Sequence, residues 1–126
     1  MEITISQEQA RIPVTVFQVE GRINMGNADN LIKQAEQSYA DGTRDLVVDL
    51  SQVESMTSAG LRAILSILKL FTFGSSQGGS GAGVSGKSTH FKLVGPTKYV
   101  EMVLNTAGFD RYIEIYPEVP AALASF

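Results

Sequence analysis

The chain has 126 residues and a net charge of −3, it is 44% hydrophobic, and it contains no cysteine. This length supplies one hydrophobic core, so we expect a single domain over residues 1–126. The acidic balance argues against nucleic acid as a partner, and the lack of cysteine excludes disulfides and thiolate metal sites. The N-terminus has no signal-peptide pattern and the longest apolar stretch, residues 61–73, is shorter than the about 20 residues that span a bilayer, so we expect a cytoplasmic protein without membrane insertion.

The first half of the chain predicts a hairpin, a helix and a buried strand. Residues 3–5 and 13–19 are rich in β-branched and aromatic side chains, which favours two strands joined as a hairpin. Residues 28–40 carry apolar side chains at helical spacing, with Asn27 as the candidate N-cap. The continuous apolar run within residues 44–50 is typical of a central strand that is covered on both faces.

The middle of the chain contains the most strongly periodic helix. Residues 51–60 are predicted to form a polar turn, and a helix is expected to begin near Ser58 and to continue through residues 61–71. The apolar stripe of this helix is wide, so the helix is either deeply buried or offers apolar surface to a partner. A Gly/Ser-rich inserted loop, residues 74–89, follows it.

The last part of the chain predicts a strand, a helix and a short strand. Residues 90–95 alternate as a strand does, and Thr97 and Gly108 are typical of the start and the stop of a helix. Residues 112–116 predict the last strand, and a helical turn is expected after it. This order predicts an α/β fold with a mixed β-sheet and helices packed on it.

The segment GAGVSGKS, residues 81–88, matches the phosphate-loop pattern at every fixed position, with Gly86, Lys87 and Ser88 as the candidate nucleotide-binding residues. A phosphate loop needs a buried strand before it and a helix after it, because both aim backbone N–H groups at the phosphates. Here a Gly/Ser-rich stretch precedes the match and a predicted strand follows it. We therefore favour a long loop, either a natural insertion or an engineered linker, and keep nucleotide binding as an alternative.

The stretch from Asp49 to Leu65 has the strand, turn and helix that the glycine-rich segment lacks. A hydroxyl at the start of this helix has two roles open to it. Thr57 or Ser58 can cap the helix by accepting a hydrogen bond from a free backbone N–H. Ser58 can also carry a phosphate, because the helix macrodipole favours negative charge at this end.

The sequence resembles the STAS domains, whose simplest members are the bacterial anti-sigma-factor antagonists. The likeness covers nearly the whole chain: the opening hairpin with VEGRI, the helix after it, DLVVDLSQVESMTSAGLRAIL, FKLVGPTKYVEMVLNTAGFDRYIEIYP, and a short end rich in Ala. In that family the motif after the central strand reads Asp-Ser, then Ser, Thr or Ala, then Gly-Leu, and an anti-sigma-factor kinase phosphorylates the serine. The resemblance implies that Ser58, followed by Ala59, Gly60 and Leu61, is the phosphoacceptor.

The resemblance implies a binding switch that catalyses nothing and needs no cofactor. Its unphosphorylated surface would dock on a serine kinase that acts as an anti-sigma factor, and a phosphate on Ser58 would break that contact. We expect a monomer or weak dimer. The expected partner-binding residues are Met25, Gly26, Met56, Thr57, Ser58, Ala59, Gly60 and Arg62. Met56 is expected to be core more than contact, and Met25 and Gly26 can equally be turn residues.

Thr57 stands where the family commonly has Asp, which changes the surroundings of the acceptor. Thr57 is accordingly a second candidate phosphoacceptor, and a non-phosphorylated adaptor in a transport or signalling assembly is the alternative function. Outside this region, His90 is interpreted as a strand-start residue, and no acid or base partner is evident for Asp45 or Asp49. We expect no metal site and no acid–base pair from these residues.

Overall fold

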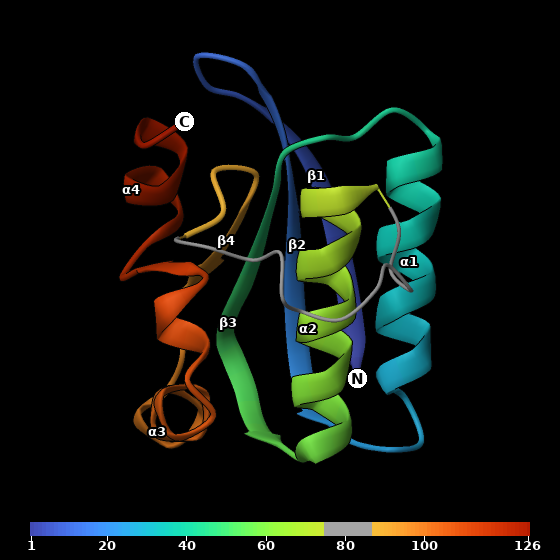
Figure 1. Ribbon diagram of the computed structural model, residues 1–126, viewed down its shortest axis with the longest axis vertical. Coiled ribbons are helices and arrows are strands. Elements are labelled where there is room, and N and C mark those ends of the chain that lie inside the picture. Colours follow the sequence, from blue (N-terminus) through green and yellow to red (C-terminus); the bar gives the residue numbers. More distant parts are fainter. Residues whose placement is uncertain (75–86) are drawn as a thin grey trace.

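The computed structural model describes residues 1–74 and 87–126, and its elements follow the predicted order (Figure 1). Strands alternate with helices after an opening pair of strands. The elements are β1 (Glu2–Gln9), β2 (Pro13–Ile23), α1 (Ala28–Ala40), β3 (Leu46–Met56), α2 (Ser58–Phe73), β4 (Phe91–Val94), α3 (Lys98–Thr106), the 3-10 turn η2 (Phe109–Arg111), β5 (Glu114–Tyr116) and α4 (Val119–Ala124).

The strands form one five-stranded sheet in the order β1-β2-β3-β4-β5. β1 and β2 pair antiparallel, as the predicted hairpin requires, and the other neighbours pair parallel. Each parallel connection runs through a helix, which is how parallel strands are usually joined. The α/β class and the mixed sheet are therefore confirmed.

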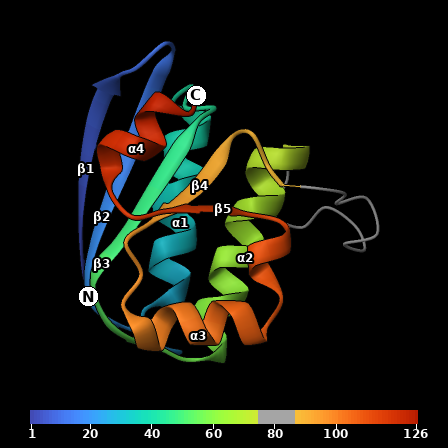
Figure 2. The ribbon, with the colours of Figure 1, turned by 90° about the vertical axis from the view of Figure 1, so that its left-hand side faces the viewer.

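Helices cover both faces of the sheet, and each face has its own apolar cluster. The larger cluster joins side chains of α1, α2 and α3 to the inner faces of the strands, while a smaller one lies under α4. Figure 2 shows α4 on the side of the sheet opposite α1 and α2. In β3, Leu46 and Val48 belong to the larger cluster and Val47 to the smaller one. This confirms the prediction that both faces of the central strand are covered.

The predicted polar turn at residues 51–60 is wrong for most of its length, because β3 continues as a strand to Met56. Its partner β2 is equally long, and the two strands stay paired to the register Ile23–Met56. The register shifts near Gly21, which has a φ of 99°. Backbone pairing therefore keeps this polar stretch extended although its composition favours a turn.

The helix ends follow the sequence signals at several points. Thr97 caps α3, since its side-chain oxygen accepts a hydrogen bond from the Val100 N–H, and Gly108 takes the left-handed conformation after that helix. Asn27 precedes α1 as expected, but its side chain does not cap the helix. Its carboxamide instead bonds the backbone of Asn24 in the loop before α1 and of Arg22 near the end of β2.

The predicted loop at residues 74–89 lies between elements that end and begin close to where we expected. α2 ends at Phe73 and β4 begins at Phe91, and residues 75–86 lie outside the described part of the chain. No helix within residues 1–74 or 87–126 has the length and apolarity to cross a membrane.

We expect Thr97→Ala to lower the free energy of unfolding by about 1 kcal/mol, because the first turn of α3 loses its capping acceptor. Urea denaturation checks this value. Thr106→Ala is the matched control, since Thr106 is an exposed threonine in the last turn of the same helix. Equal effects of the two substitutions would contradict the capping role.

Candidate functional site

Two neighbouring strands end side by side and bring the predicted binding residues to one end of the molecule. Ile23 closes β2 and Met56 closes β3, and the two are register partners in the sheet. The Thr57 N–H donates to the Ile23 carbonyl at 3.0 Å, so the pairing continues to the residue before α2. The loop from β2 to α1 and the start of α2 therefore lie together, at the lower end of Figure 1.

Two asparagine side chains shape the loop that carries Met25. Asn24 Oδ1 accepts from the Gly26 N–H at 2.9 Å, and Asn27 Oδ1 accepts from the Asn24 N–H at 2.9 Å. The Asn27 amide also donates to the Arg22 carbonyl at 2.8 Å. These bonds hold the loop while Met25 projects from it with 81% of its surface exposed.

Gly60 lets α2 approach the ends of β2 and β3 closely. A Cβ at this position would overlap Cγ of Met56 and lie 3.0 Å from Cγ2 of Ile23. Met56 is 3% exposed and belongs to the larger core cluster. Gly60 and Met56 were expected to bind a partner, but both are buried, so they support the site from beneath while the exposed residues of the predicted set lie above them.

Thr57 and Ser58 are exposed at the N-terminus of α2. Thr57 occupies the N-cap position, yet its side chain makes no capping hydrogen bond, so the capping prediction is wrong for this residue. Within the described parts of the chain, neither hydroxyl has a hydrogen-bond partner. The first turn of α2 contains no acidic residue, and the positive end of its dipole faces solvent beside Ser58.

A surface depression of about 330 Å³ lies between α1, α2 and the Met25 loop, and we call it the α1–α2 groove. Its lining residues are Met25, Ala28, Asp29, Ile32, Ala59, Arg62 and Ala63. The sequence predicted Met25, Ala59 and Arg62 as partner-binding residues, but not Asp29 or Ile32. The α1 residues were missed because the packing of α1 against α2 carries no local sequence signal.

The charged residues of the groove are Asp29 on α1 and Arg62 on α2. Among the residues that the structure describes, neither the Asp29 carboxylate nor the Arg62 guanidinium takes part in an ion pair. The remaining lining is mostly small and apolar. The groove can therefore accept an apolar side chain from a partner, with one charge of each sign available beside it.

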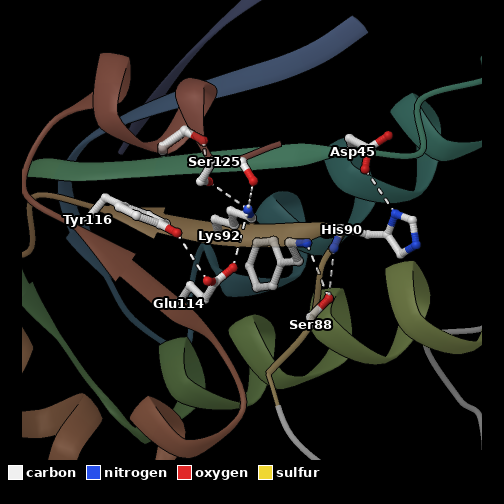
Figure 3. Close-up of polar contacts among 9 residues, drawn as sticks. Asp45, Ser88, His90, Lys92, Glu114, Tyr116 and Ser125 are labelled. Carbon is white, nitrogen blue, oxygen red and sulfur yellow. Dashed lines mark hydrogen bonds and ion pairs between the residues drawn. The ribbon is translucent and has the colours of Figure 1, made fainter. Parts of the chain in front are cut away.

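A second set of polar contacts lies elsewhere on the sheet (Figure 3). His90 Nδ1 and Asp45 Oδ1 are 2.9 Å apart just before the paired strands β4 and β3, so Asp45 has a partner that the sequence did not reveal. Lys92, 2% exposed, bonds Ser125 Oγ at 2.6 Å and the Glu114 carboxylate at 3.2 Å. Asp45 and Ser58 flank opposite ends of β3, so this set is separate from the candidate site.

Lys87 and Ser88 lead into β4, while Gly86 lies outside the described residues. The Ser88 hydroxyl accepts from the N–H groups of His90 and Phe91, each at 3.2 Å. A strand follows these residues where a phosphate loop has a helix. Within residues 1–74 and 87–126, no three His, Asp or Glu side chains cluster as metal ligands.

The chain is similar in sequence and in structure to known proteins. The STAS domain family model matches residues 5–73. A Thermotoga maritima protein named "Putative anti-sigma factor antagonist" is 31% identical over 111 residues, which are 87% of each chain. An anti-sigma factor antagonist from Mycobacterium paratuberculosis has a similar structure, with a TM-score of 0.73, 27% identity, and coverage of 98% of this chain and 93% of that one.

The fold likeness extends to more distant structures. The anti-sigma factor antagonist SpoIIAA, in its unphosphorylated form, has a TM-score of 0.68 over 94% of this chain and 92% of its own. Its identity of 13% makes this a likeness of fold alone.

We expect Gly60→Ala to lower the free energy of unfolding by about 1–3 kcal/mol, because the added methyl overpacks the contact with Met56 and Ile23. Chemical denaturation measures the loss. In a double-mutant cycle, Met56→Ala should be less damaging in the Gly60→Ala background, since it makes room for the methyl. Additive effects would show that the two residues do not press on each other.

We expect Asn27→Ala to loosen the Met25 loop, because it removes the bonds to Asn24 and Arg22. Amide hydrogen exchange should speed up at residues 24–27, while global stability falls by about 1 kcal/mol or less. Asn30→Ala, an exposed asparagine of α1, is the control and should leave exchange in the loop unchanged. Unchanged exchange in Asn27→Ala would refute the ordering role.

Proposed function

Because this chain belongs to the STAS domain family, we propose that it is a non-catalytic protein-interaction switch that acts as an anti-sigma-factor antagonist. In this proposal it works in the cytoplasm, and a partner serine kinase, itself the anti-sigma factor, phosphorylates Ser58. The observation that carries the proposal is the exposed Ser58 hydroxyl, which has no partner among the described residues and stands at the start of α2 beside the α1–α2 groove.

Ser58 can accept a phosphate without loss of a structural bond. Its hydroxyl does not cap α2, because the N-cap residue is the preceding Thr57. A phosphate adds a charge of about −1.5 to −2, and the positive end of a helix tolerates it. The modification therefore changes the surface charge and leaves the packing beneath Gly60 intact.

The proposed docking surface combines an apolar anchor with the acceptor. Met25 is held out by the Asn24 and Asn27 bonds, and a flexible thioether adapts well to a partner's surface. Docking over Met25 and the groove would bury the start of α2 as well. A phosphate at Ser58 would then have to be desolvated in the interface, which opposes binding.

Thr57 supports the second candidate function, a STAS adaptor that is never phosphorylated. The residue before the serine is neutral here, so a kinase that reads an acidic group at that place would not find one. Thr57 is itself exposed and its hydroxyl has no partner in the described part of the chain, which keeps it as a second acceptor within the first proposal.

We expect intact-mass spectrometry and peptide mapping of the protein from its own cells to find one phosphate on Ser58. With Ser58→Ala as bait, affinity purification from those cells should recover the kinase partner. Ser58→Asp should weaken that binding tenfold or more, which corresponds to about 1.4 kcal/mol. Ser58→Asn, similar in shape but neutral, should bind much more tightly than Ser58→Asp.

Two outcomes would change the conclusion. If no phosphate is found and the Asp and Asn variants bind alike, the switch is excluded and the adaptor takes its place. If the phosphate maps to Thr57 and persists in Ser58→Ala, the acceptor assignment moves by one residue while the switch remains.

A further inference from the structure

Arg62 lies one helical turn after Ser58 on α2, and we propose that phosphorylated Ser58 captures the Arg62 guanidinium in an intramolecular ion pair. This inference rests on the proposed function of Ser58 and adds a role for a second residue. The modification then does more than add charge at one point, because it also removes the free cation from the α1–α2 groove.

The helix geometry brings the two side chains together. Ser58 and Arg62 are at positions i and i+4 of one continuous helix, a spacing that places Cβ atoms about 5–6 Å apart. Side chains on a helix lean toward its N-terminus, so Arg62 leans toward Ser58. Both residues are exposed, and an arginine side chain is long enough to reach a phosphate on its neighbour.

Arg62 is available for this contact. It has no ion-pair partner among the residues that the structure describes, whereas Arg44 stacks on Tyr39 and Lys92 bonds Glu114. The anionic side chain that shares the groove with it is Asp29. A phosphate carries more charge than one carboxylate and accepts a bidentate pair of guanidinium hydrogen bonds, so it should win the competition for Arg62.

The order of the pair along the helix is also favourable. An acidic group N-terminal to a basic one at i, i+4 stabilises a helix more than the reverse order, and the phosphate lies at the positive end of the dipole. The unmodified protein keeps Arg62 beside Met25 and the groove. We therefore expect the group of the docked partner protein that faces Arg62 to be acidic. Phosphorylation of Ser58 then takes the Arg62 guanidinium away from that acidic group.

The test places phosphoserine at position 58 by genetic encoding and titrates the phosphate by ³¹P NMR. We expect the pKa of the phosphate to be lower in the otherwise unaltered protein than in Arg62→Gln by about 0.3 units, as an i, i+4 ion pair would produce. Arg62→Lys should retain much of the difference, and the difference should shrink in 1 M salt, where the Debye length is about 3 Å.

Lys69→Gln is the matched control, because it removes the same charge from the same helix at a position remote from Ser58. The phosphate of this variant should have the same pKa as that of the otherwise unaltered protein. Equal phosphate titration in the unaltered protein and in Arg62→Gln, with both proteins shown to be folded by thermal unfolding, would overturn the proposal.

The outcome is separable from that of the proposed function. Encoded phosphoserine needs no kinase, so an Arg62-dependent shift supports the ion pair even if mass spectrometry finds no phosphate on Ser58 in cells. Conversely, phosphorylated Ser58 in cells with no Arg62-dependent shift keeps the switch and rejects the capture of Arg62.

Discussion

The pairing of β2 with β3 to their last residues is the constraint on which the site depends. Ile23 and Met56 end in register, and the Thr57 N–H still bonds the Ile23 carbonyl. This pairing sets the point at which α2 can begin and places it beside the loop that follows β2. The close approach at Gly60 then holds the first turn of α2 against both strand ends. Without this pairing, the positions of Met25 and Ser58 relative to each other would not be fixed.

The two ends of the central strand have different characters. Before β3, Asp45 bonds His90, and on the next strand the buried ammonium of Lys92 is bonded by Ser125 and Glu114. The Lys92 ammonium needs its partners, because an unpaired buried charge is costly. At the other end of β3, the hydroxyls of Thr57 and Ser58 are exposed, as are the charged side chains of Asp29 on α1 and Arg62 on α2. Among the described residues, the polar side chains before β3 are paired, whereas Thr57, Ser58 and Arg62 at the candidate site have no partner.

A switch of this kind requires little movement of the backbone. The hydroxyl of Ser58, the proposed acceptor, lies outside the capping and packing contacts, so a phosphate there would alter charge and hydration above an unchanged core. The apolar residues beneath it, Met56 and Ile23, are almost fully buried and keep the helix in place. This division between a rigid support and a chargeable surface is consistent with control of partner binding through a single exposed side chain.

The sequence alone determined the element order, the α/β class and the family, because apolar periodicity and the Ser58-Ala59-Gly60-Leu61 motif are local features. It also located Ser58 at the start of a helix. Only the tertiary structure decided that residues 51–56 are strand, since the pairing with β2 overrides their turn-like composition. The groove residues Asp29 and Ile32, and the partners of Asp45 and Lys92, likewise depend on contacts between distant segments. Local patterns carry no information about which helix faces which, and packing alone brings these side chains together.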